Sequence, residues 1–226
     1  MAQAAVPNMD QATIEAGKLP AKETDTHIYF FGYDTGSKYD CFQQWYPSKF
    51  TEPALSDQPG LDHFPTSEHY MMAMKSRVMR DEETAKKITQ AKTPAEAKTL
   101  GREVKNFNQQ IWDAACDAVV ERGNWLKFGQ NDELAEILLS TGDKTIVEAS
   151  PSDKIWGVGF DVNNAEGRED QWGANKLGKA LMRVRERIRS GEKEGDWPRI
   201  VKLEGCTSCG SCGKPHSNLR EIMAES

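Results

Sequence analysis

The sequence predicts a mainly helical α+β domain with a small β-sheet. Five or six segments show helical signals, namely apolar residues at helical spacing or helix-capping residues, whereas only about three short runs have the composition of strands. The strands do not alternate with helices as in βαβ units, and no segment recurs at a fixed period. The sequence therefore favours neither a doubly wound sheet nor a repeat protein.

The first 65 residues contain one clear strand signal. Residues 1–26 are polar and lack periodicity, which predicts a disordered leader. The aromatic and β-branched run at 27–31 predicts the first strand. From 32 to 65, Gly, Asp, Ser and Pro lie between aromatic residues that include Trp45 and Tyr46. This mixture predicts irregular loops lining a cleft, although the aromatic residues would equally serve packing of a lid on the core.

Two helix starts follow. Thr66 or Ser67 is a suitable N-cap for the first helix, and its apolar stripe has the spacing i, i+3, i+7. The members of this stripe, which we interpret as core packing, are Met71, Met74 and Val78. The sequence Thr-Pro-Ala-Glu at 93–96 is a capping box with proline at the first helical position, and it predicts a second helix.

The middle of the chain predicts two more helices. One runs over 109–122, with Gly123 as its C-terminal stop. Its apolar side is formed by Ile111, Ala115 and Ala118. The next helix has Asn131 as its N-cap, and the residues expected to face inward are Leu134, Ile137 and Leu138.

The last part of the domain combines strands with a long helix. Residues 145–149 and 155–160 have the composition of short strands. A helix over 175–189 is amphipathic, with arginines and lysines on one side. The apolar residues on its other side are Leu177, Leu181, Val184 and Ile188.

Composition restricts the possible functions. The 226 residues are 38% hydrophobic and 28% charged, and no stretch approaches the length of about 18 apolar residues that spans a bilayer. Neither a secretory signal nor a disulfide framework is apparent, which favours the cytoplasm or nucleus. The net charge of −6 argues against bulk binding of duplex nucleic acid but permits a local basic pocket for one phosphorylated ligand. The common nucleotide-binding and hydrolase motifs are absent from the sequence.

Two side chains are candidates for chemistry by their local setting. Glu68 is expected in the first turn of its helix, where the helix dipole favours an ionised carboxylate that stabilises positive charge at an anomeric carbon. An acid at this position also serves ordinary helix capping. Lys127 lies among aromatic and apolar residues, and desolvation would lower its pKa and make it a nucleophile that forms a Schiff base. The alternative is a lysine whose stem covers the helix while its amine reaches water.

A second group of candidates would bind the substrate. Trp156 is positioned to stack on a base, and Gly157 permits close approach of the backbone to a ligand, although glycines here equally indicate a β-bulge. Asp161 is a candidate to bind ribose hydroxyls. Asn175 precedes the last helix, whose free N–H groups would accept a phosphate, unless this residue is simply an N-cap.

The order of these segments resembles the NADAR (YbiA-like) family over residues 27–190. The stretch Phe-Pro-Thr-Ser-Glu-His-Tyr at 64–70 resembles the family signature. A second block runs from Lys127 to the Trp156–Gly157 pair, and the stretch 173–185 is similar to the family's closing helix. The sequence departs from many members at Gln43–Gln44, where they have a Ser-Asn pair.

The resemblance implies a single domain that cleaves N-glycosidic bonds. Its implied substrate is either ADP-ribosylated guanine, as a base in a nucleotide or oligonucleotide, or a small ribosylamino-pyrimidine phosphate of riboflavin synthesis. A non-catalytic ADP-ribose or nucleotide reader is the alternative of another class. The catalytic residues we expect are Glu68, Lys127 and Asp161. Those expected to bind substrate are Trp45, Tyr46, His69, Trp112, Trp156, Gly157 and Asn175.

The C-terminal part lies outside this resemblance. Residues 191–205 predict a polar linker, and residues 206–226 predict a cysteine-rich tail. The candidate metal ligands of the tail are Cys206, Cys209, Cys212 and His216. This set suits a structural zinc ion, with an iron–sulfur site or a metal-free, disordered thiol-rich tail as alternatives. We expect no cofactor to be required for catalysis.

Overall fold

The computed structural model describes residues 21–58 and 60–196 of the chain. This part contains six α-helices, five strands and four 3₁₀ helices, which confirms the mainly helical α+β prediction. The helices are α2 (Ser67–Val78), α3 (Glu82–Thr89), α4 (Pro94–Arg102), α5 (Gln109–Gly129), α6 (Asp132–Ser140) and α7 (Lys176–Arg189). The strands are β1 (Ala21–Glu23), β2 (His27–Phe30), β3 (Phe50–Thr51), β4 (His63–Phe64) and β5 (Thr145–Glu148). The 3₁₀ helices are η1 (Lys38–Phe42), η2 (Pro53–Leu55), η3 (Glu169–Gln171) and η4 (Glu194–Asp196).

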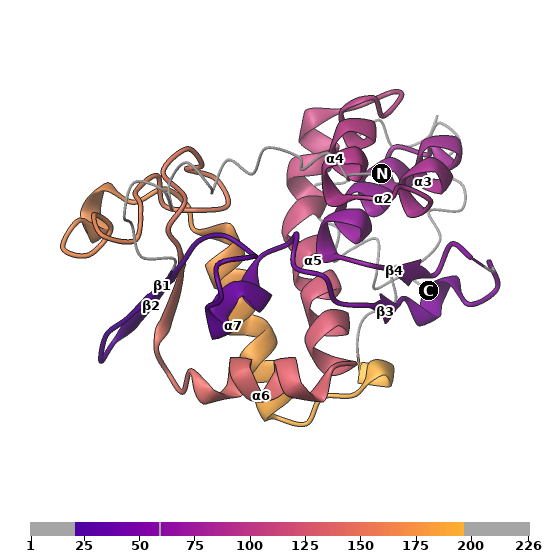
Figure 1. Ribbon diagram of the computed structural model, residues 1–226. Helices are drawn as coiled ribbons and strands as arrows, with labels where there is room; N and C mark the ends of the chain where they lie inside the picture. Colours follow the sequence, from indigo (N-terminus) through magenta and orange to yellow (C-terminus); the bar gives the residue numbers. More distant parts are fainter. Residues whose placement is uncertain (1–20, 59, 197–226) are drawn as a thin grey trace, which may run out of the picture.

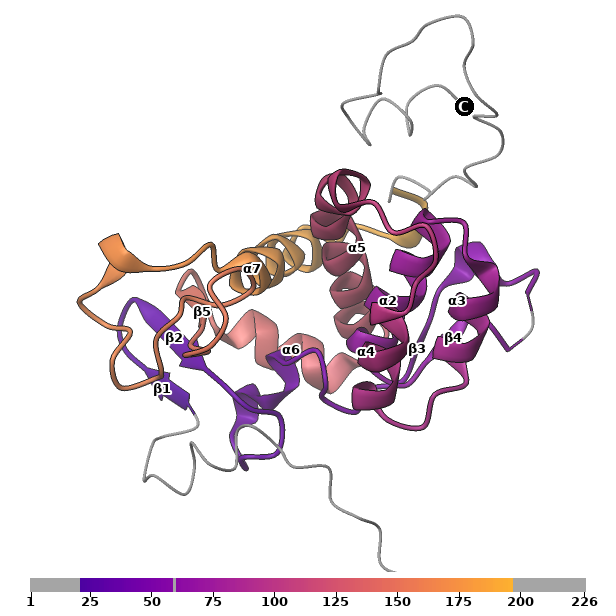
Figure 2. The same cartoon turned by 90° about the horizontal axis from the view of Figure 1, so that it is seen from above.

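A small sheet stands at one end of the molecule and a group of helices at the other (Figures 1 and 2). The sheet has the order β1-β2-β5, in which β2 pairs antiparallel with β1 and parallel with β5. The connection from β2 to β5 contains α2 to α6. Helices α5 and α7 pack together in the middle, and α2, α3 and α4 form the group at the far end (Figure 2).

Two expectations about the chain were wrong, one about the predicted leader and one about a predicted strand. Residues 21–26 do not belong to a disordered leader, because β1 pairs with β2 and a turn joins the two strands. The segment 155–160 forms bends instead of a strand. Its carbonyl groups at Ile155 and Trp156 accept hydrogen bonds from the first N–H groups of α7, at 3.2 and 3.1 Å. Backbone groups used to cap a helix are not available to a strand ladder.

Helix α5 is longer than predicted because Gly123 does not end it. The helix continues to Gly129, and a Cβ atom at position 123 would lie 2.6 Å from the ring of Tyr70. The glycine therefore allows the close approach of α2 to α5. The predicted apolar stripe is also corrected at its first member, because Ile111 is 47% exposed in the first turn, outside the core.

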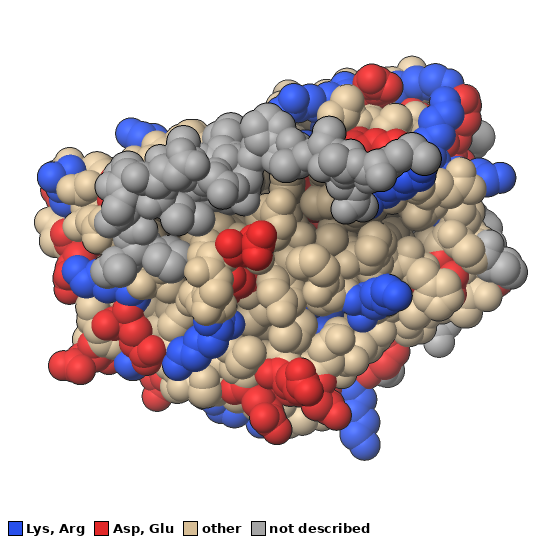
Figure 3. Space-filling model, viewed as in Figure 1, with Lys and Arg blue, Asp and Glu red and all other residues tan. Residues whose placement is uncertain are grey.

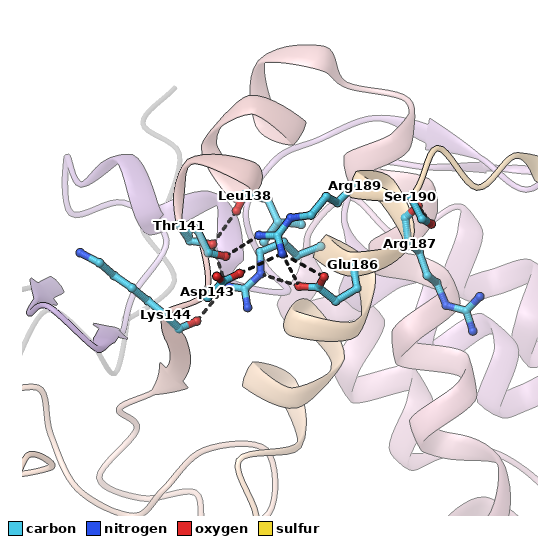
Figure 4. Close-up of polar contacts among 10 residues, drawn as sticks. Leu138, Thr141, Asp143, Lys144, Glu186, Arg187, Arg189 and Ser190 are labelled. Carbon is cyan, nitrogen blue, oxygen red and sulfur yellow. Dashed lines mark hydrogen bonds and ion pairs between the residues drawn. The ribbon is translucent and has the colours of Figure 1, made fainter.

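The closing helix α7 has the predicted apolar face, but not all of its basic residues are solvated. Arg185 is buried, and its guanidinium donates to Thr141 Oγ1 at 2.9 Å and to the carbonyl of Lys144 at 2.8 Å. Arg189 donates to the carbonyl of Gly142 at 2.6 Å, and it forms ion pairs with Asp143 and Glu186 (Figure 4). These bonds attach the end of α7 to the turn that precedes β5.

The predicted linker is ordered where it leaves α7. Glu194 in η4 forms an ion pair with Arg122, with an oxygen–nitrogen distance of 2.5 Å. Arg122 is buried and also pairs with Glu52, which accepts a hydrogen bond from Tyr70. A buried arginine needs such partners, so residues 191–196 belong to the folded domain. The proposed metal ligands of the tail lie outside the described residues.

Candidate active site

A cavity of about 500 Å³ opens between the end of the small sheet and the α2–α4 group. Its walls come from the segment after β2, the loop after η1, helices α2, α4, α5 and α7, and the end of β5 with the loop after it. Three of the predicted substrate-binding residues line it, namely Trp45, Trp112 and Trp156. Glu68 lines it as well. The volume is in the range typical of small-molecule sites.

Glu68 is held at the cavity by the first turn of α2. Thr66 is the N-cap and accepts a hydrogen bond from the N–H of His69, while the N–H of Glu68 donates to the carbonyl of Gln44 at 3.0 Å. The Glu68 side chain is 3% exposed. Among the described residues, its Oε1 atom has no hydrogen-bond partner. A buried carboxylate oxygen without a partner, in the wall of a cavity, is a group available to a ligand.

The charge state of Glu68 differs from the prediction. Burial raises the pKa of this carboxyl to about 7, against the opposing effects of Lys98, a hydrogen bond from the Trp45 side chain, Arg102 and Lys75. The helix dipole does not hold the group fully ionised, because desolvation outweighs the favourable charges. Glu68 therefore changes protonation near neutral pH, the property of a general acid or base.

Burial of Glu68 makes stability depend on pH. Because the folded pKa of about 7 exceeds the unfolded value, the folded state binds more protons between pH 4.5 and 7, and stability falls as the pH rises through this window. We therefore expect Glu68→Gln to raise the melting temperature at pH 8 and to have little effect near pH 4. Calorimetric melting curves at the two pH values test this, and an equal effect at both would contradict it.

A second carboxylate, which the sequence did not single out, lines the same cavity. Glu148 ends β5, is 8% exposed, and accepts a hydrogen bond from Gln43 Nε2 at 3.3 Å. Two of the predicted substrate-binding residues position it instead of lining the cavity. The Asn175 amide accepts from the N–H of Glu148 at 3.1 Å and donates to the carbonyl of Ile146 at 2.9 Å. A Cβ atom at Gly157 would lie 2.7 Å from the carbonyl oxygen of Glu148.

The predicted phosphate site at the start of α7 is wrong. Lys176 and Leu177 donate their N–H groups to the carbonyls of Ile155 and Trp156. Asn175 gives no side-chain cap, has a left-handed backbone, and uses its amide on β5. These two N–H groups already have hydrogen-bond acceptors, so they are not available to bind an anion at this end of the helix.

Lys127 lies behind the cavity wall. It is fully buried in α5, and its Nζ atom donates to the carbonyl of Gln43 at 2.9 Å. Burial lowers the pKa of the amine to about 7, and the ring of Tyr46 lies 5.6 Å from it. The expected desolvation is thus present, whereas the water-exposed alternative is wrong. Neither Lys127 nor Tyr46 lines the cavity, although Gln43 does.

Two further candidates stabilise local structure away from the cavity. Both ring nitrogens of His69 are used, Nδ1 with Thr66 Oγ1 at 2.8 Å and Nε2 with the carbonyl of Ala91 at 3.2 Å. Asp161 accepts from the N–H of Asn163 and the amide of Asn164, both at 3.0 Å. Their contacts fix a helix start and a loop, so the structure gives neither residue a place in the wall of the cavity.

Three cations that the sequence did not indicate also line the cavity. They are Lys75 in α2 and Lys98 and Arg102 in α4. On the visible face of the molecule, acidic and basic side chains are interspersed without a broad field of one sign (Figure 3). In the part of the chain that the structure describes, no group of histidine, cysteine and acidic residues is arranged to hold a metal ion.

The fold is that of a NADAR domain. The NADAR domain family matches residues 29–189, and the chain belongs to this family. None of the described helices is long and apolar enough to cross a membrane.

The chain is similar to several proteins of known name and to one solved structure. The chain is 43% identical over 167 residues to N-glycosidase R617 of Acanthamoeba polyphaga mimivirus, covering 73% of this chain and 97% of that protein. It is 33% identical to the riboflavin biosynthesis protein VVA0006 of Vibrio vulnificus, covering 72% of this chain but 38% of that protein. The NMR structure of the E. coli protein YbiA superimposes with a TM-score of 0.59 at 26% identity, covering 78% of this chain and 92% of YbiA.

Proposed function

We propose that this domain is a hydrolase that cleaves the N-glycosidic bond between the C1 atom of a ribose and the nitrogen of a base. The observation that carries the proposal is Glu68, a buried carboxyl with a pKa near neutrality in the wall of a cavity that three tryptophans also line. The name of the similar mimivirus N-glycosidase supports the same activity.

In the proposed reaction, the ionised Glu68 carboxylate stabilises the positive charge that develops at C1 as the bond to the base nitrogen breaks. Glu148 orients the attacking water and accepts its proton, while the departing nitrogen takes up a proton from solvent. Trp45, Trp112 and Trp156 provide faces on which a base can stack. The products are the sugar, now with a hydroxyl group at C1, and the unmodified base.

We further propose ADP-ribosylated guanine as the substrate. The cavity combines several aromatic side chains with three cations, which matches a ligand that has two bases and a diphosphate. The alternative substrate is a small ribosylamino-pyrimidine phosphate, supported by the name of the Vibrio relative. Comparing turnover of both substrates at equal concentrations tests the choice, and faster cleavage of the pyrimidine compound would assign the domain to riboflavin metabolism.

The pH dependence of the rate follows from the role of Glu68. Because the ionised form is the active one, kcat/KM is expected to rise with pH through about 7 and then level off. A Glu68→Gln enzyme is expected to retain only residual activity, and any rise through pH 7 that remains in it is assigned to Lys127, whose pKa is also about 7. A rate that falls through the same range would instead identify Glu68 as the proton donor to the leaving base.

We also propose that Lys127 captures the sugar. Its pKa of about 7 leaves much of the amine neutral, and the amine has to leave the Gln43 carbonyl to attack C1. As the amine attacks, the bond from C1 to the base nitrogen breaks, and the base takes up the proton that the amine loses. The ring then opens to a Schiff base, and water hydrolyses the Schiff base to release the sugar and restore the amine. Borohydride added during turnover is expected to leave a reduced sugar adduct on the Lys127 peptide, detected by mass spectrometry. An adduct on no lysine would assign the attack to water alone.

A further inference from the structure

Three cations from two packed helices converge on the candidate active site. Lys98 and Arg102 are four residues apart in α4, so they lie on the same face of that helix. Lys75 comes from α2, which packs against α4. All three line the cavity that holds Glu68, and all three favour the ionised form of that carboxyl. The cavity thus has a positive side next to its proposed catalytic carboxylate.

Glu68 lies near this cluster, but the three cations form no ion pairs with it or with other acids of the described residues. Within residues 21–58 and 60–196, none of the three cations has a carboxylate oxygen within 4.0 Å. Other surface cations of the same region do, as with Lys105 and Glu83 at 2.7 Å. Glu68, Glu148 and Asp153 also line the cavity, but none of them forms an ion pair with the three cations, so positive charge on the α2–α4 side is available to an anionic ligand group.

The ammonium group of Lys75 is held in place by contacts with its neighbours. Its Nζ atom donates to the carbonyl of Gly101 at 2.8 Å and lies 4.5 Å from the centre of the Phe107 ring and 5.9 Å from that of Trp112. The ammonium is partly buried, and both burial and the nearby Arg102 lower its pKa. The negative charge of an anion bound beside it would offset both effects, because it favours the charged form of the amine.

We propose that Lys75, Lys98 and Arg102 form a subsite for the phosphoryl groups of the substrate. The inference rests on the proposed function, because it places the phosphate end of the ligand on the α2–α4 side while the sugar C1 faces Glu68. Arg102 offers paired N–H donors to phosphoryl oxygens, and the two lysines act as point charges. The chemistry fits both a phosphomonoester and a diphosphate.

Titration calorimetry with ADP-ribose, ribose 5-phosphate and adenosine tests the subsite. The measurements use a Glu68→Gln background, so that removal of cations does not act through the protonation of Glu68. In this background, the double substitution Lys98→Gln and Arg102→Gln is expected to weaken ADP-ribose binding roughly 10- to 100-fold, the loss typical of charge-assisted hydrogen bonds. Adenosine binding is expected to stay unchanged.

The matched control replaces two exposed lysines away from the cavity, Lys86→Gln and Lys179→Gln, and changes net charge equally. Equal weakening by the control pair, or equal weakening of adenosine binding, would overturn the subsite. If ribose 5-phosphate shows the same loss as ADP-ribose, one phosphoryl group suffices; a larger loss for ADP-ribose indicates a diphosphate. Because these are binding measurements, they remain decisive even where the wild-type protein cleaves no substrate, which would refute only the proposed function.

Discussion

Replacing Glu68 with glutamine is expected to lower kcat about 10²- to 10⁴-fold, the usual contribution of a group that transfers protons or stabilises charge. The substitution keeps the shape of the side chain but removes the negative charge near C1. Because Glu68 is buried with its Oε1 atom free of partners among the described residues, the amide is accommodated without loss of a protein contact at that atom. The fold should therefore survive, and the loss should be one of chemistry.

Single-turnover rates measure this effect separately from binding. The matched control is Glu136→Gln in α6, an exposed acid away from the cavity, which should retain the wild-type rate. Circular dichroism verifies that both variants are folded. A Glu68→Gln protein that cleaves at the wild-type rate would remove Glu68 from the mechanism and leave Glu148 as the carboxylate to be tested.

The second large effect is expected on stability, at Gly178 in α7. A Cβ atom there would lie 2.1 Å from the carbonyl oxygen of Ile146 and 2.5 Å from Asn175 Oδ1. The first contact is with backbone, so α7 and β5 have to separate. We expect Gly178→Ala to reduce the free energy of unfolding by about 1–3 kcal/mol, the range for overpacked cores. Activity should fall too, because Asn175 holds the backbone of Glu148.

Urea unfolding of Gly178→Ala beside Gly129→Ala provides the comparison. Gly129 ends α5, and a Cβ atom there meets nothing within 4 Å. This control is expected to be neutral or to gain up to about 1 kcal/mol, because alanine restricts the unfolded chain. Similar stabilities for the two variants would show that α7 approaches β5 less closely than described.

The helices could be predicted where sequence signals are local. Thr93 with Pro94 marks the start of α4, and the apolar stripe of α7 is regular. Helix α3 was not predicted, although Asp81 caps it, because it has only eight residues. Strand β1 was missed because it is a short, polar edge strand. Gly123 was assigned to a helix end because only the tertiary contact with Tyr70 reveals its role.

The candidate site was only partly predictable for a similar reason. Glu68 and the three tryptophans stand in motifs that the sequence displays, and all line the cavity. Asn175 and Gly157 belong to the same motifs, but their contacts with β5 make them positioning residues. Glu148 and the cations of α2 and α4 carry no local signal. They come together because segments that are distant in the sequence pack against each other, and local patterns in a single sequence do not reveal such contacts.

The most direct measurement is the product analysis of an ADP-ribosylated guanine oligonucleotide incubated with the wild-type protein. Mass spectrometry is expected to find the unmodified oligonucleotide together with free ADP-ribose. An oligonucleotide that stays fully modified after long incubation, while calorimetry detects its binding, would contradict the hydrolase and identify a reader of the modified base.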